Sequence, residues 1–224
     1  MFRKVVVGAF FYVYLNRIDL LKALSVPFIA YLIIGFVNEF EIDKLTYYFL
    51  LTLSFLIQTI FAITTHRIIL LGKESVPKWG LRYWSKRETF FLIHVLILTG
   101  GLYLLLLASI VIGFIPIFVL PIIFIFWVWG RLSLVFPGIA IDKGVSFKMS
   151  WALTRKYQLL MFLVVIAFPT LLALPSVLLN YVPYTAVLIN IISTFVIVFE
   201  VSALSVAYQL ITSCSKETLA SQTE

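Results

Sequence analysis

The stretch that decides the fold has three parts: PIIFIFWVWG (residues 121–130), VFPGIAIDKGVSFKMSWALTRKY (135–157) and LLMFLVVIAFPTLLALPSVLL (159–179). The middle part carries five Lys, Arg or Asp residues between two apolar runs, in a chain that is only 12% charged. The whole chain is 62% hydrophobic, whereas soluble domains are about half apolar and about a quarter charged. Because a soluble fold of this size would expose a large apolar patch, the sequence predicts a membrane protein.

Six windows of the sequence are long and apolar enough to cross a bilayer as helices. Roughly 20 apolar residues suffice for one crossing, and the windows are residues 18–37, 45–65, 89–111, 116–136, 159–179 and 187–211. Short turns join the windows in pairs. We therefore expect an all-α, polytopic membrane protein with six transmembrane helices in three hairpins. Residues 1–212 form one domain in this interpretation, and residues 213–224 form a short polar tail.

The placement of Lys and Arg predicts the orientation. If the six windows cross the membrane, all but Lys44 of the 17 Lys and Arg residues fall on one side. Short cytoplasmic loops carry these residues in excess. The pattern predicts a protein of the cytoplasmic membrane with both termini in the cytoplasm.

The basic segment between the fourth and fifth windows combines charge with tryptophan. The residues DKG (142–144) predict a turn. Helical spacing from Ser146 onward places Lys148, Trp151 and Arg155 on one stripe. Anionic headgroups attract such cations, and Trp prefers the boundary between headgroups and hydrocarbon. We expect an amphipathic helix here that lies at the cytoplasmic interface, with a solvated linker helix as the alternative.

A similar segment, KESVPKWGLRYWSKRE (73–88), precedes the third window and predicts a second interfacial helix there. Its candidate lipid contacts are Trp79, Arg82 and Trp84. At the N-terminus, residues Lys4, Gly8, Tyr12 and Asn16 recur every four positions and predict a further helix in the headgroup region. Each segment predicts contact with anionic lipid on the cytoplasmic side.

The stretch LLLLASIVIGFIPIFVLPIIFIFWVWGRLSLVFPGIAIDKGVSFKMSWALTRKY (104–157) also resembles a known family. Its Pro-interrupted span, the Arg at the end of that span, the FPGIAIDKG link and the SWALTRKY helix are similar to YciC-like membrane proteins. They are also similar to the membrane domain attached to some glycerophosphodiester phosphodiesterases. The resemblance implies a six-span bundle with cytoplasmic termini. It implies no particular activity, and this chain carries no phosphodiesterase domain.

Glu200 and Arg131 are the candidate intramembrane polar pair. Glu200 lies within the sixth window and Arg131 near the end of the fourth. Charged residues inside a membrane are costly and are often functional. The pair is either a buried ion or proton site, or an interhelical contact that only fixes packing. Prolines within the spans, at positions 27, 116, 121, 169 and 175, can break helices around such a site.

The sequence offers few residues for catalysis, metal binding or nucleic-acid binding. His66 and His94 are the only histidines, and neither has a second ligand at helical spacing. Catalytic and phosphate-binding motifs are absent from the sequence, and no polar residues cluster in sequence around Arg131 and Asp142. We expect no catalytic residue, cofactor or metal, and no nucleic-acid partner, because topology and anionic lipid account for the positive charge.

The sequence thus favours a non-enzymatic membrane module that organises lipid or partner proteins through its basic, aromatic cytoplasmic rim. A membrane-protein partner or a homo-oligomer is compatible with this function. The alternative is a small transporter or channel subunit that uses Glu200, Arg131 and the proline-broken spans.

Overall fold

The computed structural model describes residues 1–40, 42–79, 83–112 and 115–220, and every regular element within these ranges is helical. The α-helices are α1 (Phe2–Leu15), α2 (Arg17–Val37), α3 (Lys44–Leu71), α4 (Lys86–Ile112), α5 (Ile115–Leu132), α6 (Val135–Ala140), α7 (Phe147–Leu153), α8 (Gln158–Phe162), α9 (Phe168–Leu179) and α10 (Ala186–Ala220). Two 3-10 turns, η1 (Lys73–Ser75) and η2 (Thr154–Lys156), and one π-helical turn, η3 (Leu163–Ala167), complete the set. The all-α prediction is confirmed for the described residues.

Five stretches of the described residues are long and apolar enough to cross a membrane: Arg17–Val37, Lys44–Leu71, Ile122–Ala140, Gln158–Leu179 and Ala186–Ser215. These helices indicate a membrane protein. They overlap the predicted windows 18–37, 45–65, 116–136, 159–179 and 187–211. The remaining window, 89–111, lies within α4, but several of its side chains are outside the description. Six spans therefore stay a prediction.

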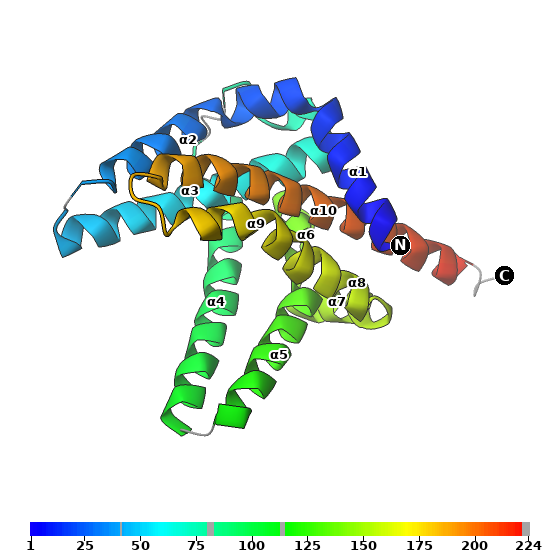
Figure 1. Cartoon of the computed structure of the whole chain (residues 1–224). Coiled ribbons are helices and arrows are strands. Elements are labelled where there is room, and N and C mark those ends of the chain that lie inside the picture. The colour runs from blue at the N-terminus through cyan, green and yellow to red at the C-terminus, as the bar shows by residue number, and fades with distance from the viewer. Residues whose placement is uncertain (41, 80–82, 113–114, 221–224) are drawn as a thin grey trace.

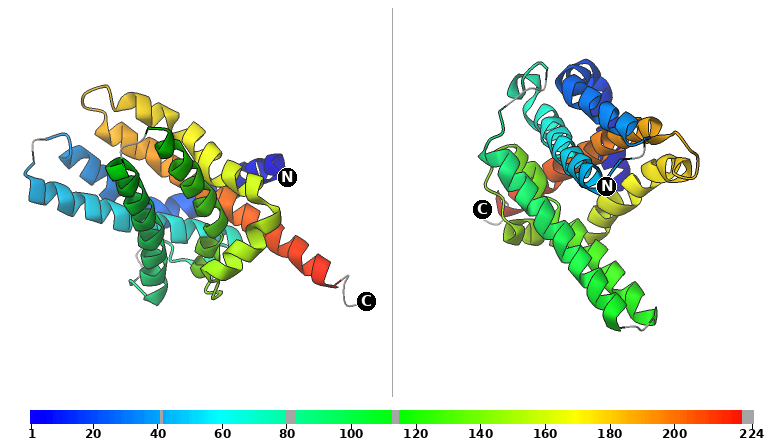
Figure 2. Two further views of the ribbon diagram at one scale, coloured as in Figure 1. Left: turned by 90° about the horizontal axis from the view of Figure 1, so that it is seen from below. Right: turned by 90° about the vertical axis from the view of Figure 1, so that its left-hand side faces the viewer.

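The helices α2, α3, α9 and α10 lie together, while α4 and α5 diverge from them. Figure 1 shows α2, α3, α9 and α10 grouped, with α10 in contact with α1, α2, α3 and α9. The α4–α5 pair projects steeply away from this group in both Figure 1 and Figure 2. It joins the rest mainly at its base, where α4 contacts α3 and α6, and α5 contacts α7 and α8. Hydropathy predicts which helices meet lipid, but neighbouring helices set the tilt.

The N-terminal helix α1 packs against α10. Val5 and Ala9 have no exposed surface, and a Cβ on Gly8 would lie 3.1 Å from Cγ1 of Val206. Gly8 therefore permits close approach of two helices, as small residues do in membrane proteins. The predicted headgroup-facing stripe of residues 4, 8, 12 and 16 is therefore only partly open to its surroundings, because Gly8 is half-buried against α10.

The link 135–157 folds into the protein core. Pro137, Gly138 and Ala140 of α6 are buried, and Asp142 adopts φ 58° in the turn that follows. Ser146 then caps α7, since its hydroxyl accepts from the backbone N–H of Met149. The predicted turn near Asp142 is confirmed. The expected interfacial helix is only seven residues long, and its inner face is buried at Ser150.

The segment before α4 differs from expectation as well. In its described residues, 73–79 and 83–85, the only regular structure is the three-residue turn η1. The interfacial helix predicted before the third window is absent from these residues. Pro77 contributes to this outcome, because the residue before a proline is disfavoured in the helical region and Val76 is extended.

Candidate functional site

Arg131, near the end of α5, binds the α7 segment. Its guanidinium donates to the backbone carbonyl of Trp151 and, at 3.4 Å, to Oγ1 of Thr154. The Cζ atom lies 3.8 Å from the ring centroid of Trp151 and 5.4 Å from that of Trp127. Arg131 is buried, and cation–π contacts strengthen when water is excluded. Trp151 is thus held in place from within the protein, although part of its ring stays exposed.

The backbone of Arg131 takes part in the same contact. Ser150 Oγ donates to the Arg131 carbonyl at 2.8 Å, and Thr154 Oγ1 donates to it at 3.1 Å. Ser150 and Thr154 are fully buried. These two hydroxyl groups, four residues apart, lie on one face of the helical turn and join α7 and η2 to the end of α5. We call this set of contacts the Arg131 clamp.

Arg131 and Glu200 form no ion pair with each other. Within the described residues the ion pairs are Arg67–Asp142, Arg87–Glu88 and Arg87–Asp142. The guanidinium of Arg131 is already engaged by carbonyl, hydroxyl and indole groups of the link. The sequence did not reveal this competition, because it depends on α7 folding back onto α5.

The three ion pairs gather around Asp142. Arg67 Nη1 donates to Asp142 Oδ2 at 2.8 Å, and Arg87 Nη1 donates to the same atom at 3.1 Å. Arg67 also donates to the carbonyls of Ala140 at 2.9 Å and Ser75 at 3.0 Å. The Asp142 side chain is 58% exposed, whereas that of Arg87 is only 6% exposed. A single carboxylate therefore joins the end of α3, the start of α4 and the link.

Glu88 completes this cluster at the start of α4. Its Oε1 accepts from Arg87 at 2.8 Å, and its Oε2 accepts from the backbone N–H of Ser85 at 2.9 Å. Ser85 and Glu88 thus have the spacing of a capping box, a helix-start motif. Burial raises the pKa of the Glu88 carboxyl, but the hydrogen bonds from Ser85 and Arg87 outweigh burial and lower the pKa to about 2. Glu88 therefore stays ionised beside Arg87.

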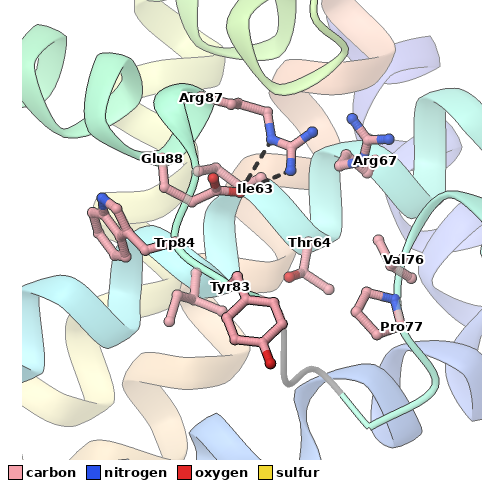
Figure 3. Close-up of a pocket in the computed structure, with 10 residues that line it drawn as sticks. Ile63, Thr64, Arg67, Val76, Pro77, Tyr83, Trp84, Arg87 and Glu88 are labelled. Atoms are coloured by element: carbon pink, nitrogen blue, oxygen red, sulfur yellow. Dashed lines mark hydrogen bonds and ion pairs between the residues drawn. The ribbon is translucent and has the colours of Figure 1, made fainter.

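Figure 3 shows a narrow pocket beside this cluster. Arg87 and Glu88 lie on one wall, Arg67 lies nearby on α3, and Tyr83 and Trp84 lie on the segment that leads into α4. We call the cluster of Arg67, Arg87, Glu88 and Asp142 the Asp142 network. It corrects the sequence-based conclusion that no polar residues cluster around Asp142.

The predicted lipid contacts are exposed at this end of the molecule, apart from one that lies outside the description. Trp79 is 61% exposed, Trp84 43% and Trp151 36%, and Lys148 and Arg155 are also exposed. Arg82 lies outside the described residues. Trp84 also donates through Nε1 to Thr89 Oγ1 at 2.9 Å, which orients its ring. The Asp142 network joins segment 73–88 to the link 135–157, so both basic, aromatic segments lie at one end of the molecule. We call the exposed Trp, Lys and Arg side chains of these two segments the basic rim.

A second region of interest is a cavity at the base of α4 and α5. Its polar lining consists of Gln58, Thr59, His66, Ser133 and Glu200, and the remaining lining is apolar or aromatic. Nδ1 of His66 lies 2.7 Å from Ser205 Oγ on α10, so this contact is a hydrogen bond. We call this space the Glu200 cavity. Apolar cavities with a few convergent polar groups are typical binding sites.

A π-helical turn forms part of the cavity wall. Val165, which lines the cavity, lies within η3, where the backbone N–H of Phe168 bonds to the carbonyl of Leu163. Pro169 follows at once and has no N–H to donate to the carbonyl one turn earlier. The hydroxyl of Thr170 donates to the Ile166 carbonyl at 2.6 Å. Such π-turns are frequent at functional sites.

The described residues contain no group of three His, Cys, Asp or Glu side chains that could hold a metal ion. The functional candidates that sequence reasoning missed are Arg67, Arg87, Glu88 and Asp142 of the network, and Ser150 and Thr154 of the clamp. Only the capping-box spacing of Ser85 and Glu88 was visible in the sequence. The other contacts join residues up to 75 positions apart.

Comparisons of the chain with protein-family models, with curated proteins and with solved structures found no match.

Proposed function

We propose that this protein is a non-enzymatic module of the cytoplasmic membrane that binds anionic lipid through its basic rim. The observation that carries the proposal is the Asp142 network, which fixes two basic, aromatic segments at one end of the molecule. A rigid rim presents its Trp and Lys or Arg side chains at one level. Cations at a membrane surface attract anionic lipids by about 1 kcal/mol each.

The same proposal includes the orientation. In this proposal the rim and both termini face the cytoplasm. The end of α3 and the start of α4 bring the basic segments together, and short cytoplasmic loops are rich in Lys and Arg. The likeness of residues 104–157 to YciC-like proteins supports a six-span bundle in this orientation. A rim that concentrates anionic lipid also offers a surface for a membrane-protein partner or a second copy of the chain.

The rim is tested by lipid binding to the full-length protein. Native mass spectrometry compares dioleoylphosphatidylglycerol with dioleoylphosphatidylcholine for the wild type and for the double variant Lys148→Gln/Arg155→Gln. Losing two surface cations weakens the preference for the anionic lipid by about 2 kcal/mol, or about 25-fold. The control is Lys44→Gln, at the opposite end of α3. An unchanged preference in the double variant, or an equal loss in the control, overturns the proposal.

A second function, transport, is favoured by the Glu200 cavity. A carboxylate, an imidazole and amide and hydroxyl groups line one space between helices, and ionisable residues inside a membrane often mark proton or ion pathways. The π-turn interrupts the regular α-helical hydrogen bonding of the Gln158–Leu179 segment, and Pro175 lies within α9. Interrupted helices often form the substrate sites of transporters.

Proton flux tests this second function. In proteoliposomes that hold a pH-sensitive dye, we expect the wild type to carry protons, Glu200→Gln to abolish the flux and Glu200→Asp to retain part of it. Absence of proton flux in the wild type, or full flux in Glu200→Gln, contradicts a proton-transporting role for the cavity.

A further inference from the structure

An apolar groove is lined by residues of α1, α2 and α10. Figure 1 shows the arrangement of these three helices. Its wall on α2 consists of residues 17, 20, 21, 24, 25 and 28, which recur every three or four positions and share one helix face. Its opposite wall is formed by α10 between Thr194 and Phe199, and Val13 of α1 closes one side. The groove is separate from both the basic rim and the Glu200 cavity.

The groove has a closed floor and an open edge. Leu20 and Leu24 are buried at 4% and 6% exposure, whereas Leu21 is 70% and Phe195 58% exposed. The lining is almost entirely apolar, and both α2 and α10 belong to stretches long and apolar enough to span a membrane. The open edge therefore faces the lipid phase, and a chain that enters from there contacts aliphatic and aromatic side chains along its length.

The length of the groove matches one leaflet. From Arg17 to Phe28 the α2 face extends for about 16 Å at 1.5 Å per residue. The hydrocarbon core of a bilayer is about 30 Å thick, so one leaflet contributes about 15 Å. A lipid acyl chain that lies along α2 from one headgroup layer to the bilayer centre thus fits the groove from end to end.

The only charged side chain in the groove lies at its end. Arg17, the first residue of α2, donates through Nη1 to the Tyr14 carbonyl at 2.9 Å, and its Cζ lies 4.3 Å from the Tyr14 ring centroid. Among the described residues, no ion pair involves Arg17. Its other N–H groups stay available, and the planar guanidinium fork suits a phosphate.

We propose that this groove binds one acyl chain of an anionic phospholipid, whose headgroup phosphate pairs with Arg17. The apolar wall holds the chain by packing, because lipid tails gain no hydrophobic energy when they leave a bilayer for a protein groove. The guanidinium supplies the headgroup preference. The site stands independently of the basic rim, since the two share no residue.

The test separates the chain contact from the headgroup contact. Leu21→Trp fills the groove from its exposed edge, and Arg17→Gln removes the charge. Native mass spectrometry of the full-length protein measures retention of dioleoylphosphatidylglycerol and dioleoylphosphatidylcholine. We expect Leu21→Trp to weaken retention of both lipids, and Arg17→Gln to weaken only the anionic lipid, by about fivefold, which corresponds to about 1 kcal/mol.

Two control variants on the same helix lie outside the groove. Ile29→Trp adds the same side chain at a site that is 57% exposed, and Lys22→Gln removes an exposed cation. We expect both control variants to retain wild-type lipid binding. Wild-type retention in Leu21→Trp, or equal losses in the two charge variants, overturns the groove proposal. If only the Lys148→Gln/Arg155→Gln rim variant loses binding, the rim stands and the groove fails. If only Leu21→Trp and Arg17→Gln lose binding, the groove proposal stands and the rim proposal fails.

Discussion

Arg131 and Glu200 lie in contrasting surroundings, although both are charged residues within long apolar segments. The Arg131 guanidinium donates a hydrogen bond to the Trp151 carbonyl and stacks on the Trp151 ring. The Arg131 carbonyl accepts hydrogen bonds from the hydroxyls of Ser150 and Thr154. Glu200 lines a cavity beside His66 and Gln58, and no ion pair reaches it within the described part of the chain. A buried cation with several hydrogen-bond partners holds elements of a fold together, whereas a carboxylate without an ion pair is a candidate for ligand or proton binding.

The largest expected effect comes from the Arg131 clamp. Arg131→Ala removes a charged hydrogen bond to Trp151 and the cation–π contact, and it should lower the free energy of unfolding by about 3 kcal/mol. Arg131→Lys keeps the charge without the planar stack and should lose less. Unfolding in mixed micelles, followed by tryptophan fluorescence, measures both. The exposed Lys148→Gln should change stability by less than about 0.5 kcal/mol. A loss in Lys148→Gln as large as in Arg131→Ala would remove the distinction between clamp and rim.

The close approach within the link gives the next largest effect. A Cβ at Gly138 would lie 2.2 Å from Cγ2 of Val145, so Gly138→Ala forces the turn apart and should cost about 2 kcal/mol. Gly144→Ala is the matched control, because a Cβ there meets nothing within 4 Å. The same unfolding experiment compares the two. Equal stability of the two variants would show that the link is not tightly packed at Gly138 and Val145.

Asp142→Asn tests the network that holds the two basic segments together. The change leaves Arg67 and Arg87 without their shared carboxylate, and it should cost about 1.5 kcal/mol because Asp142 is half exposed and partly screened. Cysteine cross-linking between segments 83–85 and 143–144 should also become less efficient. Unchanged cross-linking would mean that the rim is held by other contacts.

The Asp142 network should also make the free energy of unfolding depend on pH. The folded-state pKa of Glu88 lies below its ordinary value, so its contribution is complete above that value and is lost as pH falls toward about 2. Between pH 5 and pH 3 we expect the free energy of unfolding to fall by about 1 kcal/mol, because the carboxyl takes up a proton in the unfolded chain over this range while it stays largely ionised in the folded protein. Glu88→Gln should flatten this part of the stability profile. A profile that keeps its slope in the variant would assign the acid sensitivity to another group.

Glu200→Gln should have the smallest effect on stability, less than about 0.5 kcal/mol, because it breaks no ion pair in the described structure. The same unfolding measurement applies. A loss as large as that of Arg131→Ala would make Glu200 a packing residue and abolish the contrast between the two regions. An unchanged free energy of unfolding in Glu200→Gln, together with altered proton flux, would support the contrast between Arg131 and Glu200.

Sequence reasoning succeeded where the signal is local. Five of the six apolar windows and the turn at Asp142 depend on neighbouring residues, and the structure shows them. The failures involve contacts that leave no pattern in the sequence. The link became a buried element because Gly138 meets Val145 and Arg131 meets α7, and neither contact has a periodic signature. Helix α1 turned its Gly8 face toward α10 for the same reason.

The sequence by itself determined that apolar helices dominate this protein and that its cations gather in a few segments, because hydropathy and charge are properties of each residue. Only the tertiary structure decided which charges meet. Asp142 binds Arg67 across 75 positions and Arg87 across 55, and Arg131 turns to Trp151 instead of Glu200. Electrostatic and hydrogen-bond energies fall steeply with distance, so partners are set by how the helices pack and not by their order along the chain.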